Sequence, residues 1–143
     1  MQRIAIGSDH GGYDLKKKIQ AKISADWLDV GAFNQESSSY VEFAKKVSEK
    51  VQNQEVDYGI IICRSGIGVS IAANKYKKIY AALCLNNSMA KSARSHNNAN
   101  VLCIAADYTS LDQAIEMIAI FLSTPFESGG RHEQRFNSIA QIP

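Results

Sequence analysis

The sequence lacks a long apolar run, a secretory signal and a large charge of either sign. No apolar stretch approaches the roughly 20 residues that a membrane-spanning helix needs, and the N-terminus enters a strand-like run without the pattern of a signal peptide. The formal net charge of +2 is too small to indicate a surface for nucleic acid or membrane. We therefore expect neither a nucleic acid nor a membrane as a partner.

Cysteine is scarce as well. Cys63, Cys84 and Cys103 form an odd set without a CxxC pair, so a disulfide framework is not expected and a reducing compartment fits better. We therefore expect a cytoplasmic protein. The length of 143 residues suits one domain over residues 1–143, and the chain contains no internal repeat, linker or low-complexity segment.

Short apolar runs alternate with longer amphipathic segments along the whole chain. Ile60, Ile61 and Ile62 are apolar at successive positions, which indicates a strand buried on both faces. Strand–helix alternation of this kind predicts a parallel sheet covered by helices on both faces. The strands are expected at residues 3–8, 27–30, 58–63, 81–85 and 101–105.

The amphipathic segments have the spacing of helices. Apolar residues recur at every fourth position over residues 15–23 and 43–51, and a third such segment starts at Leu111. Residues 110–113, Ser-Leu-Asp-Gln, have capping-box spacing just before it. We expect the lysines at 16–18 to form a solvated helix face, and the end of the chain to form a polar helix after a glycine pair.

Polar residues follow two of the expected strands. In open α/β sheets, ligands bind beyond the carboxyl ends of the strands. Residues 8–12, Ser-Asp-His-Gly-Gly, follow the first strand, and residues 63–68, Cys-Arg-Ser-Gly-Ile-Gly, follow the third. A further cluster, Ser-His-Asn-Asn at 95–98, precedes the fifth strand after a helical segment, where this rule does not predict a site.

Cys63 ends a strand and is followed by a glycine-containing turn into a helix. The positive end of that helix and the neighbouring Arg64 both favour the thiolate form. Free backbone N–H groups across residues 65–68 could also hold a phosphate or a developing oxyanion. The alternative is a small buried residue that ends an apolar strand, and the pattern leaves both open. Cys84 and Cys103 lie inside apolar runs, so we interpret them as packing residues.

Asp9, His10 and His96 are ambiguous by pattern. An acid and an imidazole at a strand end could open a sugar ring or bind a hydroxyl or phosphate, whereas Asp and Gly also make plain turns. A histidine at a helix end is often only solvated. Arg131 and Arg135, spaced i and i+4, share a helix face that either binds a phosphate or is merely solvated.

The common cofactor motifs are absent. Gly66 and Gly68 match part of a dinucleotide-binding fingerprint, but Ile71 occupies its third glycine position. No GxxxxGK[ST] loop is present, and the three histidines have no zinc-binding spacing with the cysteines. We therefore expect chemistry without a cofactor or a metal ion.

Four segments resemble the ribose-5-phosphate isomerase type B family, which is related to the subunits of galactose-6-phosphate isomerase. They are residues 6–12, 62–75, 95–97 and 129–135, in the family's order and spread over essentially the whole chain. The 62–75 segment, with its Gly-x-Gly turn and its Ala-Ala-Asn-Lys sequence, is highly specific.

The resemblance implies a Rossmann-like three-layer sandwich with a five-stranded parallel sheet, working as a homodimer or dimer of dimers with active sites at the subunit interface. It implies an aldose–ketose isomerase that interconverts ribose 5-phosphate and ribulose 5-phosphate through an enediolate, without a cofactor. By the same resemblance, the site residues are Cys63 as the base, Ser65 in the proton relay, Gly66, Ile67 and Gly68 as enediolate-binding amides, His96 with Asp9 in ring opening, Asn97 on sugar hydroxyls, and His10, Arg131 and Arg135 on the phosphate.

The sequence departs from the family pattern in three places. Arg64 replaces the glycine that usually follows the cysteine, and residues 39–41 read Ser-Tyr-Val where many members have Asp-Tyr-Pro. Asp107 stands where some members have a phosphate-binding arginine, and an acid there would repel a dianionic phosphate unless it points away or Arg64 compensates. An isomerase of a six-carbon sugar phosphate (allose or galactose 6-phosphate) and a non-catalytic sugar-phosphate-binding protein therefore stay open as alternatives.

Overall fold

Five parallel strands form the centre of the protein, which we describe from a computed structural model of residues 1–143. The strand order is β2-β1-β3-β5-β4, so β2 and β4 are the outer strands. The chain builds the β2 side of the sheet first and then crosses over to build the β4 side. All neighbouring strands are parallel. The strands are β1 (Arg3–Ser8), β2 (Asp26–Asp29), β3 (Tyr58–Cys63), β4 (Ala81–Leu83) and β5 (Val101–Ala105).

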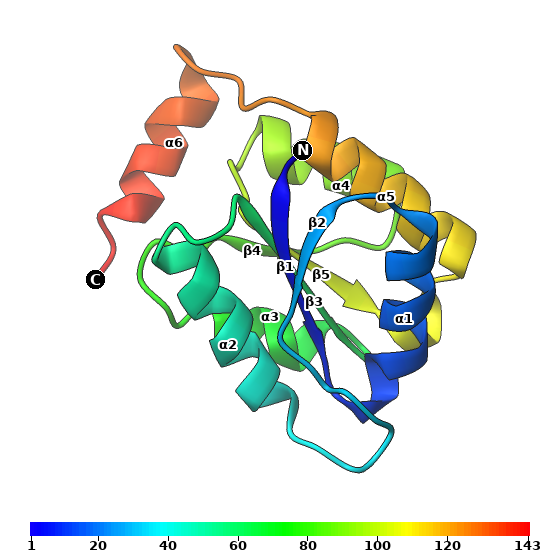
Figure 1. The fold of residues 1–143 in the computed structure, drawn as a ribbon. Helices are drawn as coiled ribbons and strands as arrows, with labels where there is room; N and C mark the ends of the chain where they lie inside the picture. The colour runs from blue at the N-terminus through cyan, green and yellow to red at the C-terminus, as the bar shows by residue number, and fades with distance from the viewer.

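Helices cover both faces of the sheet (Figure 1). α1, α4 and α5 contribute to the apolar core on one face, and α2 and α3 to the core on the other. No helix is both long and apolar enough to pass through a membrane. The helices are α1 (Tyr13–Lys22), α2 (Tyr40–Gln52), α3 (Ile67–Ala73), α4 (Asn87–Ser95), α5 (Leu111–Ser123) and α6 (Arg131–Ala140), with short 3-10 turns at His10–Gly12 and Ala106–Tyr108.

This architecture is the three-layer α/β sandwich that the sequence predicted. The second strand lies one residue earlier than expected, at Asp26–Asp29, and the fourth ends at Leu83 instead of residue 85. Both differences are at strand ends, where the apolar pattern carries the least information. They leave the order and direction of the strands unchanged.

The central strand β3 is buried on both sides, as its run of isoleucines predicted. Ile60 and Ile62 belong to the core under α1, α4 and α5, whereas Ile61 belongs to the core under α2 and α3. All three side chains are fully buried. Because burial of one such side chain stabilises a fold by about 1.5–3 kcal/mol, these isoleucines hold both helical layers on the sheet.

Side-chain caps set the starts of two helices at the carboxyl edge of the sheet, which is the side where the parallel strands end. Ser110 Oγ accepts a hydrogen bond from Gln113 N at 3.1 Å, as the capping-box spacing predicted. Ser39 Oγ accepts one from Val41 N at 3.3 Å. A cap of this kind stabilises a helix by about 1 kcal/mol. These two caps fix where the loops at this edge turn into α5 and α2.

Lys16 does not lie on a solvated helix face. Its side chain is fully buried, whereas Lys17 and Lys18 are exposed. The Lys16 ammonium group lies 2.7 Å from Asp29 Oδ1 and 2.6 Å from the carbonyl oxygen of Ala32. The prediction for the lysine cluster was therefore wrong at Lys16, because the end of β2 supplies a carboxylate that compensates the buried charge.

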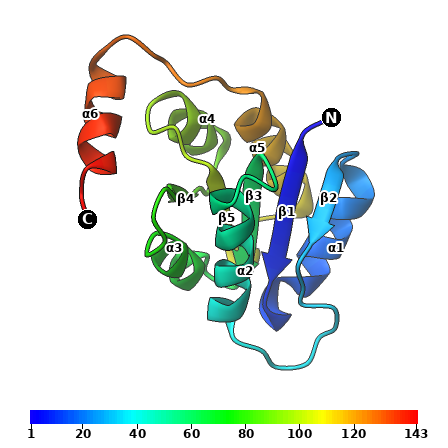
Figure 2. The same ribbon diagram turned by 60° about the vertical axis from the view of Figure 1, so that its left-hand side comes forward.

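The C-terminal helix α6 stands apart from the other helices (Figure 2). None of its ten residues is buried. It contacts the rest of the chain through His132, which stacks on His96, and through Phe136, whose ring lies 4.7 Å from that of Tyr80 and 5.5 Å from that of Phe126. α6 therefore has little packing within the chain, and a short helix with little packing is marginal in water.

Candidate active site

The carboxyl ends of β1 and β3 bring Asp9, His10 and Cys63 to the same edge of the sheet, where the polar clusters predicted a site. Asp9 is 7% exposed, and its Oδ1 accepts a hydrogen bond from Gly12 N at 3.2 Å. The Asp9 carboxylate therefore stabilises a turn, as the alternative interpretation of the Asp-Gly pattern predicted. Its Oδ2 has no hydrogen-bond partner in the chain, which leaves one oxygen for a ligand.

His10 is held by Ser38, a residue that sequence reasoning missed. Ser38 donates its backbone N–H to His10 Nδ1 at 3.1 Å, and its Oγ accepts the backbone N–H of His10 at 3.2 Å. Because Nδ1 is an acceptor, the proton of the neutral imidazole lies on Nε2. The half-buried ring therefore presents an N–H donor to a ligand.

The turn after β3 places one backbone N–H group on the Cys63 sulfur and others close by in the sequence. Cys63 is 5% exposed, and its Sγ accepts a hydrogen bond from Gly66 N at 3.2 Å. Ile67 N donates to Ser65 Oγ at 3.2 Å, and the amide of Gly68 has no acceptor within the chain. The turn thus offers a place for an oxyanion directly beside a sulfur that can act as a base.

Two glycines of this turn are required by its geometry. Gly66 has φ +71°, and a Cβ there would lie 2.5 Å from Leu83 Cδ1 and 3.2 Å from Ala105 N. A Cβ on Gly68 would lie 2.5 Å from the ring of Tyr40. Tyr40 is therefore a wall of the site, which sequence reasoning noted only as part of a departure from the family pattern.

Arg64 and Asp107, two of the departures, form a pair beside the turn. Arg64 Nη1 lies 3.5 Å from Asp107 Oδ1, and Asp107 N donates to the carbonyl oxygen of Arg64 at 2.9 Å. The side chain of Arg64 also lies against Gly11, where a Cβ would be 2.6 Å from Arg64 Cγ. The two side chains are 64% and 49% exposed. An exposed pair of this kind contributes only about 0–1 kcal/mol. Arg64 can therefore leave Asp107 and bind a phosphate with little loss of free energy.

Cys84 and Cys103 are packing residues, as predicted. Both are fully buried. Burial raises the pKa of Cys84 to about 11 and raises the pKa of Cys103 as well. Neither thiol is a base at neutral pH. Cys63, at the carboxyl edge of the sheet, is therefore the remaining candidate for a cysteine base.

His96, Asn97, Arg131 and Arg135 gather in a second group, away from Cys63. His96 follows the last residue of α4, and from there the chain enters β5 at its amino end. α6 folds back onto this region, so that the His132 ring stacks on the His96 ring at 3.9 Å and an interplanar angle of 9°. Asn97, Arg131 and Arg135 are exposed and can therefore face a ligand from outside the chain.

Sequence reasoning missed that His132 and Glu127 lie beside His96. His132 Nε2 is 3.7 Å from Glu127 Oε2, and ligand atoms of the three side chains lie within 4.8 Å of one another. Such a set could hold a metal ion, but the two rings are nearly parallel, so their in-plane nitrogen lone pairs lie in separate parallel planes and do not converge well on one ion. Desolvation, followed by the nearby His96, lowers the pKa of His132, which favours a neutral ring. Metal-free chemistry stays a prediction.

Comparison with known proteins identifies the family. Residues 4–139 match the family described as Ribose/Galactose Isomerase. The chain belongs to this family. Ribose-5-phosphate isomerase B of Escherichia coli (strain K12) is 38% identical over 145 residues, covering 99% of this chain and 97% of that protein. A putative sugar phosphate isomerase of Bacillus subtilis (strain 168) is 39% identical over 142 residues. The resemblance carried by the four sequence segments is confirmed.

Solved structures of family members share the fold over nearly the full chain. A ribose 5-phosphate isomerase from Thermotoga maritima has a TM-score of 0.95 and 43% identity, covering 99% of both chains. Ribose-5-phosphate isomerase B from Mycoplasma genitalium, solved with bound ribulose-5-phosphate, has a TM-score of 0.90 and 39% identity, covering 97% of this chain and 94% of that one. The predicted fold is thereby confirmed.

The two groups of residues that the family resemblance assigns to the site lie at opposite ends of the strands. One group is at the carboxyl edge, where the strands end, and the other is at the amino edge, where they begin. Cys63 is at the carboxyl end of β3, whereas His96 and α6 are near the amino ends of the strands, where Phe136 contacts Tyr80 just before β4. β3 has six residues. At about 3.3 Å per residue, the strand separates the two edges by roughly 16 Å. One small sugar phosphate cannot contact both groups within a single chain.

Proposed function

We propose that the chain is an aldose–ketose isomerase that interconverts ribose 5-phosphate and ribulose 5-phosphate. The observation that carries this proposal is the turn after β3, where Gly66 N donates to Cys63 Sγ and the amide of Gly68, in the same turn, has no acceptor within the chain. Proton transfer through an enediolate needs a base next to oxyanion-binding donors. The Escherichia coli relative, which is named ribose-5-phosphate isomerase B, and the Mycoplasma genitalium structure with ribulose-5-phosphate support the choice of substrate.

In the proposed reaction, Cys63 as thiolate removes the proton from the carbon beside the aldehyde and returns it to the neighbouring carbon. The electron pair passes through an enediolate, whose oxygen the amides of Gly66, Ile67 and Gly68 stabilise. Ser65 relays a proton between the two substrate oxygens. Substrate and product are isomers, so the reaction needs no oxidant or reductant. In this proposal the backbone amides supply the charge stabilisation that a metal ion would otherwise provide.

The sugar must be open before Cys63 can act. We assign ring opening to His96 together with Asp9, whose free Oδ2 is available to a ring hydroxyl. Asn97 is exposed next to His96 and is assigned to the sugar hydroxyls. A histidine and a carboxylate on opposite sides of a sugar oxygen can move the proton that ring opening requires.

We further propose that a second copy of the chain completes each site, in a homodimer or a dimer of dimers. The proposed phosphate ligands come from both edges of the sheet: His10 from one, and Arg131 and Arg135 from the other. A two-fold dimer can place the amino-edge group of one copy against the carboxyl-edge group of its partner, and it does so twice.

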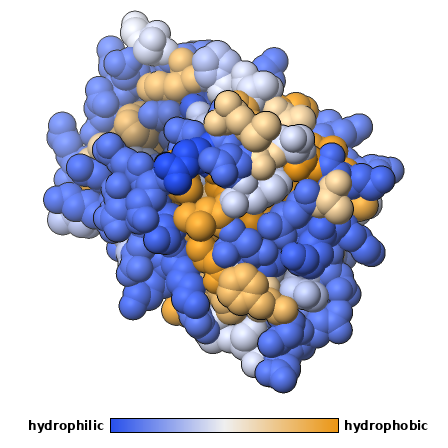
Figure 3. Space-filling model, in the orientation of Figure 1, coloured by the Kyte–Doolittle hydropathy of each residue, from blue (hydrophilic) through white to orange (hydrophobic).

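The surface of the chain supports this assembly. α6 has no buried residue of its own. Figure 3 shows a strip of apolar residues across the face viewed in Figure 1, with hydrophilic residues around it. Separately, large apolar side chains at the start of α2 and on α3 form an exposed apolar cluster next to the Cys63 turn. An exposed apolar cluster with a polar surround is typical of a protein–protein interface. The cluster comprises Tyr40, Val41, Ile67 and Ile71, which are 39%, 50%, 53% and 60% exposed.

A cytoplasmic location belongs to the same proposal. All three cysteines are free. A reducing compartment keeps Cys63 available as a base, whereas an oxidising one would expose it to disulfide formation. Cell fractionation with an antibody to the chain tests this location.

Purified protein should form ketose from ribose 5-phosphate, with allose 6-phosphate measured in parallel. Arg64 and Asp107 depart from the family pattern beside the turn, so an isomerase of a six-carbon sugar phosphate is the second candidate that the parallel assay tests. A higher kcat/KM for the pentose supports the proposal, and a higher value for the hexose assigns the second candidate. A rise of Tm with either sugar, without turnover, would indicate a binding protein.

A further inference from the structure

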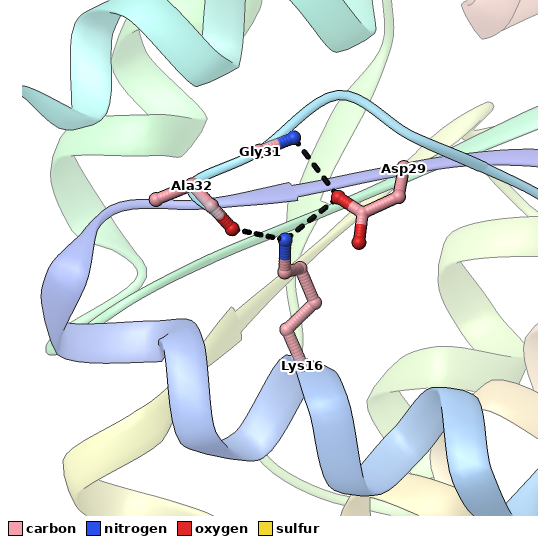
Figure 4. Close-up of polar contacts among 4 residues, drawn as sticks. All are labelled: Lys16, Asp29, Gly31 and Ala32. Carbon is pink, nitrogen blue, oxygen red and sulfur yellow. Dashed lines mark hydrogen bonds and ion pairs between the residues drawn. The ribbon is translucent and has the colours of Figure 1, made fainter. Parts of the chain in front are cut away.

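Lys16 is a buried charged residue that the proposed mechanism does not use. Figure 4 shows its side chain rising from α1 to the segment after β2, where the ammonium group contacts Asp29 Oδ1 at 2.7 Å and the Ala32 carbonyl oxygen at 2.6 Å. Asp29 Oδ1 also accepts a hydrogen bond from Gly31 N at 2.9 Å. Packing of α1 alone does not require this charge, because an apolar side chain of similar volume avoids the cost of desolvating it.

The segment that Lys16 contacts is attached to β1 immediately before the site. Ser8 N donates to the Gly31 carbonyl oxygen at 2.8 Å, and Ala32 N donates to the Ser8 carbonyl oxygen at 2.7 Å. The backbone of residues 31–32 is therefore held between Ser8 on one side and the Lys16 ammonium on the other. Asp9 and His10 follow Ser8 directly.

The loop that starts at this segment returns to His10. Ser38 holds both the backbone N–H and the Nδ1 atom of His10, at 3.2 Å and 3.1 Å. These two bonds set the place of the ring and the nitrogen that carries its proton. The loop has another side-chain contact with α1, from Gln35 Nε2 to Asp14 Oδ1, but that contact is exposed.

We propose that Lys16 is a positioning residue for His10. It fixes the start of the 31–38 loop, so that Ser38 holds the imidazole with Nε2–H free for the phosphate of the substrate. Lys16 itself does not touch the substrate. The kinetic consequence rests on the proposed sugar-phosphate site, whereas the effect on the His10 tautomer does not depend on turnover.

Two variants and a matched control test the role of Lys16. Lys16→Met removes the ammonium group and keeps an unbranched side chain. Lys16→Met/Asp29→Asn also removes the carboxylate charge that the single change leaves buried, and it keeps an oxygen acceptor for Gly31 N, so it serves if the single variant does not fold. Lys46→Met is the control, because Lys46 also pairs with a carboxylate, Glu42 at 2.9 Å, but is 45% exposed.

The first readout is steady-state kinetics with ribose 5-phosphate. We expect the Lys16 variants to raise KM about tenfold with kcat changed less than about twofold, and Lys46→Met to change neither. In a His10→Asn background the same Lys16 change should raise KM less than about twofold, because residues that act through one another are not additive. A KM ratio that is equal in the two backgrounds overturns the inference.

The second readout is the nitrogen chemical shifts of the His10 imidazole, assigned by comparison with His10→Asn. Wild type and Lys46→Met should show the Nε2–H tautomer, and the Lys16 variants a mixture of both tautomers. An unchanged tautomer in a folded Lys16 variant overturns the inference. A changed tautomer in a protein whose wild type has no turnover supports the role of Lys16 and contradicts the proposed function instead.

Discussion

Two inactive variants of this chain should restore each other's activity when they are mixed. Cys63→Ala removes the proposed base at the carboxyl edge of the sheet, and His96→Ala removes the proposed ring-opening group at the amino edge. In the proposed homodimer, each variant alone has two damaged sites. If each site combines one edge from each copy, a mixed dimer has one site with both wild-type residues and one site with neither.

The expected recovery follows from this geometry. Random exchange between equal amounts gives about one half mixed dimers, and each has one intact site of two. The mixture should therefore reach about one quarter of the wild-type specific activity. Within one chain, the six residues of β3 separate the two groups by roughly 16 Å, so a single chain cannot supply both.

The assay is ketose formation from ribose 5-phosphate after the purified variants are mixed, exchanged in mild denaturant and returned to buffer. A mixture of Cys63→Ala with Ser65→Ala is the matched control, because both changes lie at the same edge and no mixed dimer gains an intact site. Mass spectrometry of differently labelled copies verifies exchange. Activity no higher than that of the separate variants, after verified exchange, would refute the shared site.

Three further changes have defined outcomes. Arg135→Ala should raise KM about tenfold and leave Tm unchanged, because this exposed guanidinium has no partner within the chain. Steady-state kinetics and melting curves check both values, with Gln134→Ala as the control. Asp107→Asn should lower KM about two- to fivefold by freeing Arg64 and removing a carboxylate that repels phosphate, and a raised KM would contradict that role. The lowered pKa of His132 means that the folded state favours its neutral form, so the stability of α6 docking is lost as the pH falls below about 6.5. Faster amide exchange in α6 on acidification, after correction for intrinsic rates, checks this, and His132→Asn should remove it.

The carboxyl-edge half of the site could be predicted because its signals are local. The run Ile60–Ile62 indicates a strand buried on both faces, and polar turns at the ends of parallel strands must share one edge of the sheet. The place of Cys63 and Asp9 at one edge of the sheet therefore followed from pattern and chain order, whereas their roles came from the family resemblance and stay predictions. Ser38 did not, because the loop that brings it to His10 has no periodicity to mark its course.

The burial of Lys16 had a signal that the lysine cluster concealed. Lys16 precedes Ile19 by three residues and so lies on the same face of α1, which packs on the sheet. Three successive lysines indicate a solvated helix face only if none of them lies on the apolar face of the helix, and Lys16 does lie there. The compensating partner, Asp29, belongs to the next strand, and a contact between two elements cannot be deduced from the spacing in either.

The amino-edge half of the site follows from topology more than from motif. A helix that connects two parallel strands runs back across the sheet, so the end of α4 with His96 must lie at the amino edge. The rule for ligand sites in α/β sheets therefore excluded His96, although the family pattern included it. The place of α6 depends on a few contacts between distant residues, such as Phe136 with Tyr80, which no local pattern specifies.

The central claim is that Cys63 is the base of a ribose-5-phosphate isomerase. The most direct measurement is ketose formation from ribose 5-phosphate by wild-type and Cys63→Ala protein in the same assay. We expect turnover by the wild type and a loss of kcat/KM of about 100-fold or more in the variant, which is the range for removal of a general base. The circular dichroism spectrum and Tm should stay close to those of the wild type. Wild-type turnover by a folded Cys63→Ala protein would contradict the claim.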